Sequence, residues 1–147
     1  MEITAKPGNM LLCVEDIYTK LYEERLCNMK AKQVMELMNL PRTDAGNAER
    51  LRLYFKNTWK YLPQYKSWMR WDGHRWEGRN TLELNRFVAQ AFRQMALEIY
   101  RLPVPADDVA EQHRRVRIIA WLTRSQINYH TMLAVRYFKE MCREDAA

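Results

Sequence analysis

Residues 68–76 read Trp-Met-Arg-Trp-Asp-Gly-His-Arg-Trp and contain three of the five tryptophans of the chain. The Asp72-Gly73 pair at the centre suits a two-residue type I′ turn, in which both central residues take positive φ angles. Aromatic residues on either side of this pair favour extended strands. The stretch therefore predicts a short β-hairpin near residues 67–77, with its turn at Asp72-Gly73.

The segments before the hairpin show the three- and four-residue spacing of apolar side chains that is typical of amphipathic helices. Over residues 14–40 this spacing predicts one helix, or two helices broken near Cys27, and Pro41 would stop the pattern. Thr43 or Asp44 can cap the next helix. The apolar face of that helix would carry Ala48, Leu51, Tyr54 and Phe55.

The segments after the hairpin predict three more helices. Asn80-Thr81-Leu82-Glu83 has the pattern of a capping box, in which the first and the last side chain bond each other's backbone N–H. Pro103 ends the helix that follows, and Asp107 or Asp108 is expected to cap the next one. Thr123-Arg124-Ser125-Gln126 is a second capping-box pattern, and it predicts the start of a final helix.

The length and composition of the chain suit a single folded unit. Its 147 residues fit one domain, since domains most often hold about 100–150 residues. Hydrophobic residues make up 48% of the chain, and its 4 Gly and 5 Pro residues argue against a loop-rich all-β fold. We therefore predict one domain over residues 1–147 with a mostly α-helical fold, a compact bundle of five or six helices with one short β-hairpin.

The charge and the cysteine content indicate where the protein acts. A net charge of +6 attracts phosphate groups through a salt-dependent, sequence-independent attraction. The three cysteines are an odd number without close pairs, which suits a reducing compartment, and no apolar leader or run of about 20 apolar residues is present. We expect a cytoplasmic protein that does not contact a membrane.

The candidate catalytic groups do not form a recognisable site. The three histidines lie far apart in the sequence, without the spacing of zinc ligands. The adjacent Asp107 and Asp108 are placed where the positive end of a helix favours acidic residues. Gly73–Asn80 has the glycine spacing of a phosphate-binding loop, but Arg79 replaces its lysine and Asn80 its hydroxyl residue. We expect no catalytic activity, no cofactor and no metal.

Three motifs follow one another along the middle of the chain. Residues 44–50 read Asp-Ala-Gly-Asn-Ala-Glu-Arg, residues 61–63 read Tyr-Leu-Pro, and the tryptophan-rich hairpin comes next. This series resembles the helical domain that precedes the superfamily-three helicase motor in phage and plasmid primase-helicases. Members of that family typically show D-x-G-N-A-x-R, then Tyr-x-Pro, then W-x-x-W-D-G-x-R-W.

The motifs match closely over residues 44–79, and over residues 80–145 only the order of the predicted helices matches. Residues 1–43 are not covered by the resemblance, and we predict that they form an N-terminal helical extension. The resemblance implies a role in the replication of mobile genetic elements in the cytoplasm of a bacterial host. We expect the chain to contain neither a primase segment nor an ATP-binding motor. It would then be either a fragment of a larger enzyme or a stand-alone module. We expect Arg50 to project from the first turns of its helix.

Two groups of basic residues are the predicted contacts with DNA phosphates. The first group comprises Arg42, Arg50, Arg52, Lys56, Lys60, Arg70, Arg75 and Arg79, and the second comprises Arg114, Arg115, Arg117 and Arg124. We predict a non-catalytic accessory module that binds single- or double-stranded DNA without sequence preference. The alternative use of the arginines is local pairing, as between Glu49 and Arg52 or Arg50, and that of the tryptophans is packing in a small core.

The alternative function is a protein-interaction module that recruits or inhibits a helicase, an initiator or a host or phage defence protein. It relies on a methionine-rich apolar face in the helix before Pro41, because such faces adapt to partners. The residues of this face are Met29, Val34, Met35, Leu37 and Met38. Packing of the same face against its own domain is the competing interpretation.

Overall fold

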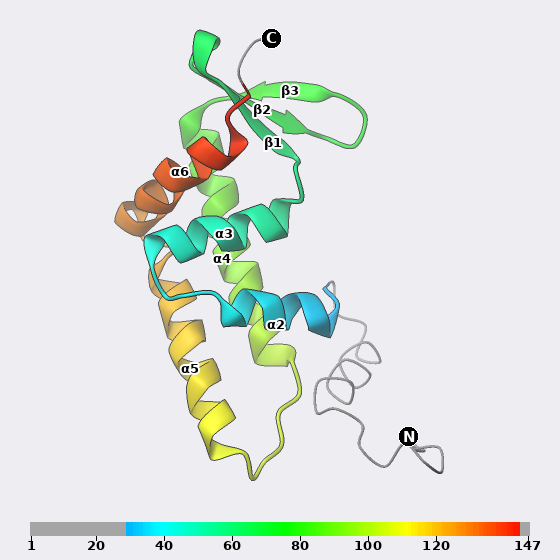
Figure 1. Cartoon of the computed structure of the whole chain (residues 1–147), viewed down its shortest axis with the longest axis vertical. Helices are drawn as coiled ribbons and strands as arrows, with labels where there is room; N and C mark the ends of the chain where they lie inside the picture. Colours follow the sequence, from blue (N-terminus) through cyan, green and yellow to red (C-terminus); the bar gives the residue numbers. More distant parts are fainter. Residues whose placement is uncertain (1–28, 145–147) are drawn as a thin grey trace.

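The computed structural model describes residues 29–144 (Figure 1). Its elements are α2 (Ala31–Asn39), α3 (Asp44–Phe55), β1 (Trp59–Leu62), the 3-10 helix η1 (Pro63–Tyr65), β2 (Ser67–Trp71), β3 (Trp76–Arg79), α4 (Thr81–Arg101), α5 (Val109–Arg124) and α6 (Asn128–Cys142). The predicted mostly α-helical fold with a small β region is therefore confirmed. The predicted helical segment before residue 29, with its break near Cys27, lies outside the described residues.

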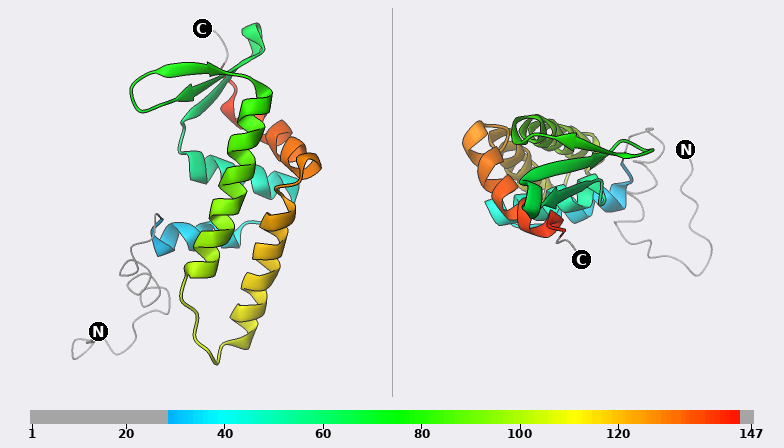
Figure 2. Two further views of the ribbon diagram at one scale, coloured as in Figure 1. Left: turned by 180° about the vertical axis from the view of Figure 1, so that it is seen from behind. Right: turned by 90° about the horizontal axis from the view of Figure 1, so that it is seen from above.

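The long helix α4 forms the axis of the molecule. Figure 1 shows α2 and α3 crossing it on one side, α5 lying along it, α6 inclined to it beside α3, and the sheet at the end where α4 begins. Seen from behind in Figure 2, no other described element lies over the outer face of α4. The apolar side chains of the five described helices and of the sheet meet in one core, which includes Leu37, Leu51, Trp68, Leu84, Phe92, Met95, Leu122 and Phe138.

The sheet has three antiparallel strands in the order β1-β2-β3. The predicted hairpin is β2–β3, but the sequence analysis did not predict β1. Trp59 and Tyr61 of β1 point into the core, and alternate residues of this strand are less buried. The strand has only four residues, so the alternation is short. The aromatic residues in and around β1 make it hard to recognise in the sequence. Pairing of Trp59 with Arg70 and of Tyr61 with Trp68 sets the register.

The turn of the hairpin differs from the predicted type I′ turn. Trp71 and Trp76 form the last pair of the ladder, so four residues rather than two make the connection. The carboxylate of Asp72 accepts hydrogen bonds from the backbone N–H groups of Arg75 (2.8 Å) and His74 (2.7 Å). These two bonds, Arg75 first, lower the pKa of Asp72. Gly73 still supplies a positive φ of 107°, whereas Asp72 does not have one.

The predicted helix starts are correct at α4 and α5 and wrong at α6. Asn80 and Glu83 form the capping box of α4, and Asp108 caps α5. The second predicted capping box, Thr123–Gln126, instead belongs to the end of α5. The hydroxyl of Thr123 donates to a carbonyl one turn back, and α6 begins after Ile127 without a side-chain cap. A hydroxyl near a helix end serves either role, because it can donate to a carbonyl or accept from an N–H.

Removal of the α4 cap has a measurable cost. We expect Asn80→Ala to lower the free energy of unfolding by about 1 kcal/mol, because the Glu83 N–H loses the side-chain oxygen that accepts its hydrogen bond at 2.8 Å. Urea denaturation followed by circular dichroism measures this loss. Asn128→Ala, at the uncapped start of α6, is the matched control and should change the free energy less. Equal losses in the two variants would contradict the assigned cap.

A buried polar cluster replaces the exposed arginine expected at the start of α3. Arg50 is fully buried, and its guanidinium donates to the carbonyl oxygens of Leu37, Leu40 and Pro41 and to the side-chain oxygen of Asn47. Burial lowers the pKa of Arg50 to about 10, so it remains protonated at neutral pH. The arginine therefore holds the end of α2 and the following turn against α3.

Asn47 extends this cluster to the other side of the domain. Its side-chain oxygen accepts from the indole N–H of Trp121 at 2.9 Å, and its amide donates to the hydroxyl of Ser125 at 2.8 Å. Asp44, one turn earlier, lies 3.3 Å from a ring nitrogen of His130 on α6. The motif at residues 44–50 thus joins α2, α3 and the junction of α5 with α6.

Candidate nucleic-acid interface

Of the twelve basic residues that we predicted as DNA contacts, Arg50 and Arg115 are not on the surface. Arg50 belongs to the buried cluster described above. Arg115 is 5% exposed, and it donates to the carbonyl of Leu102 and to the carboxylate of Glu111. Both arginines hold helices together through hydrogen bonds to groups inside the domain. They are therefore structural residues, and neither can reach a phosphate in this conformation.

Most of the remaining predicted contacts are paired with nearby groups. Five of them form ion pairs with glutamates. The pairs are Arg52 with Glu49, Lys60 with Glu144, Arg75 with Glu77, Arg79 with both Glu77 and Glu83, and Arg114 with Glu111. The guanidinium of Arg70 lies 4.5 Å from the centre of the Phe87 ring. Lys56 and Arg117 are exposed and form no ion pair with any described residue. The local pairing that we set against DNA contact is thus present for much of this set.

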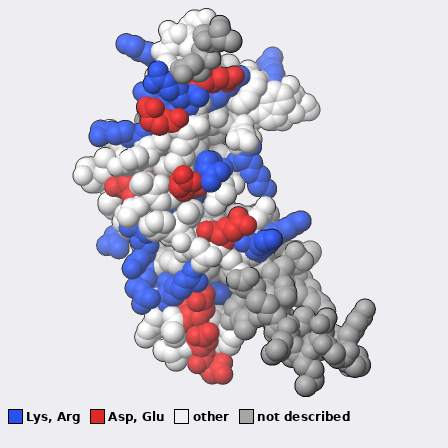
Figure 3. Space-filling view, viewed as in Figure 1, with Lys and Arg blue, Asp and Glu red and all other residues white. Residues whose placement is uncertain are grey.

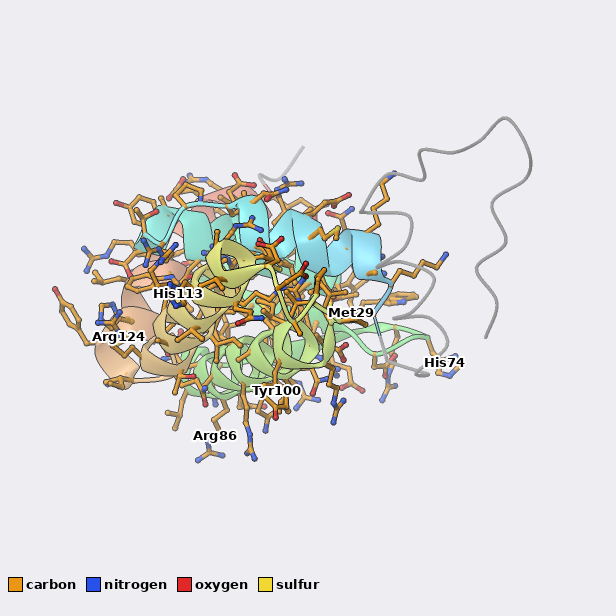
Figure 4. The ribbon with its side chains drawn as sticks, turned by 90° about the horizontal axis from the view of Figure 1, so that it is seen from below. Met29, His74, Arg86, Tyr100, His113 and Arg124 are labelled. Atoms are coloured by element: carbon orange, nitrogen blue, oxygen red, sulfur yellow. The ribbon has the colours of Figure 1, made fainter. Side chains whose placement is uncertain are left out.

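The basic surface is spread over several faces. Figure 3 shows Lys and Arg side chains at the upper end and on both sides of the view, with acidic side chains among them and at the lower end of the described part. In Figure 4, Arg86 of α4 and Arg124 of α5 extend from different sides of the molecule. The two clusters expected from the sequence therefore do not form one continuous patch.

The tryptophans of the sheet lie on its two opposite faces. Trp59 and Trp68 are almost fully buried, and Trp68 stacks on Phe138 with an angle of 11° between the ring planes. Trp71 points to the opposite face of the sheet from Trp68 and is 38% exposed beside Trp76. The expected packing of tryptophans in a small core is confirmed for Trp59 and Trp68 but not for Trp71.

A basic groove lies between the sheet and α6. We call it the α6 groove, and its lining residues are Tyr61, Lys66, Trp68, Thr81, Asn85, Met132, Val135, Arg136 and Lys139. Its volume is about 460 Å³. Three of the lining residues carry a positive charge, and none carries a negative charge. Within the described part of the chain, Lys66, Arg136 and Lys139 form no ion pair.

The two walls of the α6 groove are fixed relative to each other. The backbone N–H of Glu144, just after α6, donates to the carbonyl of Tyr61 in β1 at 2.9 Å. The ammonium of Lys139 lies 4.3 Å from the centre of the Tyr61 ring, and Phe138 stacks on Trp68. These contacts join α6 to the sheet and hold the two walls of the groove together.

The comparison with protein families identifies the chain. A family model described as D5 N terminal like matches residues 48–147. The chain belongs to the D5 N-terminal-like family. This family contains the domain that precedes the primase-helicase motor in phage and plasmid replication proteins, so the predicted relationship is confirmed. No curated protein and no solved structure matches the chain.

The three cationic residues that line the α6 groove of the D5 N-terminal-like domain were not among the predicted DNA contacts. Lys66 lies in the short turn between η1 and β2, while Arg136 and Lys139 lie three residues apart on α6. Such a spacing puts two side chains on the same face of a helix, which is a weak signal available from the sequence. The approach of α6 to Lys66 depends on tertiary packing, which no local pattern reveals.

Two histidines of the D5 N-terminal-like domain lie far from each other, whereas the third, His130, lies 3.3 Å from the carboxylate of Asp44. Figure 4 shows His74 at the hairpin and His113 on α5, well apart in that view. In the described residues, no three His, Cys, Asp or Glu side chains are placed to hold a metal ion. Burial raises the pKa of the Cys142 thiol to about 12. Across residues 29–144, no helix has both the length and the apolar character needed to cross a membrane.

The methionine-rich face expected to bind a protein partner is packed inside the D5 N-terminal-like domain. Val34, Leu37 and Met38 of α2 are buried in the core, and Met29 and Met35 pack against it while partly buried. The helix thus uses this face to hold its own domain together. Val34, Leu37 and Met38 are therefore not available for docking in this conformation, whereas Met29 and Met35 remain partly exposed.

Proposed function

We propose that this domain is a non-catalytic DNA-binding module of a phage or plasmid replication protein, acting in the cytoplasm of a bacterial host. The proposal rests on the family and on the charge of the folded part. The D5 N-terminal-like family places the chain with primase-helicase proteins, whose substrate is DNA. The DNA would be bound through its phosphates, by basic side chains that carry no sequence information of their own.

The observation that carries the proposal is the excess of positive charge on the surface. Residues 29–144 hold 21 of the 24 Lys and Arg residues, but 12 of the 18 Asp and Glu residues. Of those 21 basic residues, Arg50 and Arg115 are the buried ones. The positive side chains therefore face solvent, where they attract a polyanion and displace its counterions.

Salt dependence tests the proposal. We expect the domain to bind labelled single-stranded or double-stranded DNA with micromolar affinity in a fluorescence anisotropy titration. If three phosphates are contacted, raising the salt from about 50 to 200 mM should weaken binding roughly 20-fold for a single strand and roughly 40-fold for a duplex. Binding should not depend on base sequence.

The controls separate phosphate binding from unspecific adsorption. A neutral peptide nucleic acid of the same base sequence presents bases without phosphates, and it should not bind. An absence of salt-sensitive binding to both DNA forms at about 10 μM protein would remove the proposal, since nonspecific binders usually bind in this range.

A further inference from the structure

We infer that the α6 groove holds the sugar–phosphate backbone of single-stranded DNA. This inference rests on the proposed function and narrows it to a place on the domain and to one form of DNA. The α6 groove lies apart from the paired arginines that the sequence indicated. Its occupant follows from its charge, its size and the groups that line it.

The charge of the α6 groove suits the phosphates of a short stretch of nucleic-acid backbone. Arg136 and Lys139 are neighbours on one face of α6, and Lys66 adds a third cation from the sheet side. None of the three has to break an ion pair with a described residue before it contacts a phosphate, in contrast to Arg52 or Arg79. A chain with one negative charge for each nucleotide can engage these cations one after another.

The size of the α6 groove distinguishes a single strand from a duplex. A hollow of about 460 Å³ has the volume of pockets that hold small ligands, so it accommodates one or two nucleotide units. A double helix is too wide to enter such a hollow and can touch only its rim. A flexible single strand can follow the groove and place its phosphates at the cations.

The uncharged groups that line the α6 groove suit the DNA backbone better than a stacked base. Tyr61 and Trp68 are only 8% and 2% exposed, so neither ring offers a free face to a base. Thr81 adds a hydroxyl and Asn85 a side-chain amide N–H group, and both can donate hydrogen bonds to phosphate oxygens. Contacts with phosphate carry no base information, so we expect no base preference.

An acidic peptide is a less suitable occupant of the α6 groove. Extended peptides commonly bind by adding a strand to the free edge of a sheet. Beside the groove, the edge of β1 is already bonded at Tyr61 by residues 143 and 144. A peptide would therefore lack backbone hydrogen bonds at this edge, whereas a phosphodiester chain needs none.

Two lysines with the same unusual backbone conformation provide a matched test. Lys66 and Lys56 both have left-handed φ angles, 47° and 50°, and both are exposed without ion pairs to described residues. Lys66 lines the α6 groove and Lys56 does not. Glycine adopts this conformation without strain, so Lys66→Gly and Lys56→Gly each remove one charge while leaving the fold intact.

We expect Lys66→Gly to weaken binding to single-stranded DNA about fivefold at about 0.1 M salt, the share of one phosphate contact. Adding Arg136→Gln should weaken it roughly 25-fold and lower the log–log salt slope by about 1.4. Lys56→Gly should bind as the unmodified domain does. Fluorescence anisotropy measures all four proteins, and circular dichroism melting confirms that each is folded.

The outcomes separate the inference from the proposed function. If the unmodified domain binds neither DNA form, the proposed function fails and the inference fails with it. If the domain binds DNA but Lys66→Gly and Lys56→Gly bind equally well, the inference alone is overturned. Tighter binding to duplex than to single strand, or displacement of the strand by poly-glutamate at equal charge concentration, would also overturn the inference alone.

Discussion

Replacement of Arg50 by leucine should lower the free energy of unfolding by about 3–5 kcal/mol. The change removes the hydrogen bonds that the buried guanidinium makes to three backbone carbonyls and to Asn47. Leucine leaves these acceptors buried without donors, which costs more than the loss of an exposed contact. A domain of this size is stabilised by about 5–15 kcal/mol in total, so the loss should be plain in a urea titration.

Arg52→Leu is the matched control for Arg50→Leu. Arg52 lies two residues further along the same helix, exposed and paired with Glu49 at 2.9 Å. Because exposed ion pairs contribute little, we expect Arg52→Leu to change the free energy of unfolding by less than about 1 kcal/mol. Arg50→Lys should not restore stability, since an ammonium cannot reach the separate acceptors of a guanidinium fork. Similar stabilities for Arg50→Leu and Arg52→Leu would show that the buried cluster does not support the fold.

Replacement of Gly46 by alanine should destabilise the domain by about 3 kcal/mol. A methyl group at this position would lie 2.1 Å from the carbonyl oxygen of Pro41 and 3.1 Å from the hydroxyl of Thr43. The turn between α2 and α3 would have to move away, and it carries both the Thr43 cap of α3 and a carbonyl that Arg50 binds. The same substitution inside an unobstructed helix would stabilise it by up to about 1 kcal/mol, so the expected sign is opposite.

Gly78→Ala provides the comparison for Gly46→Ala. A methyl group on Gly78 would meet no atom within 4 Å in the described structure. We expect Gly78→Ala to leave the melting temperature unchanged or slightly raised, while Gly46→Ala lowers it by at least about 10 °C. Thermal unfolding followed by circular dichroism measures both variants. A Gly46→Ala protein that melts with the unmodified domain would contradict the close approach of the turn to α3.

The features of the fold that depend on neighbouring residues could be predicted from the sequence. The capping box at Asn80, the cap at Asp108 and the end of α2 before Pro41 all depend on residues within one helical turn. The aromatic residues around Asp72-Gly73 correctly indicated the hairpin. The length of its turn was wrong, because the pairing of Trp71 with Trp76 decides where the ladder ends.

The role of Arg50 could not be predicted in the same way. Arginine is rarely fully buried, so a solvent-exposed side chain was the reasonable expectation. Its acceptors lie in the chain 9 to 13 residues earlier, and its partner Asn47 is bonded to Trp121, 74 residues further on. Only the packing of α3 between these segments explains why an arginine is needed at this position.

The candidate site was missed for a related reason. The sequence analysis favoured basic residues close to the motifs, and local carboxylates engage many of these residues in the folded domain. Lys66 and Arg136 lie 70 positions apart in the sequence and meet across the α6 groove. A cluster of this kind exists only after folding, so neither charge runs nor motif spacing can reveal it.

The bonds between Asn47 and the junction of α5 with α6 have a consequence for synthesis on the ribosome. Asn47 and Arg50 emerge early, whereas Trp121 and Ser125 are added more than 70 residues later. Until those partners emerge, the polar groups of α3 cannot be buried without a loss of hydrogen bonding. The nascent domain therefore reaches its native arrangement late, only after the junction of α5 with α6 has been translated.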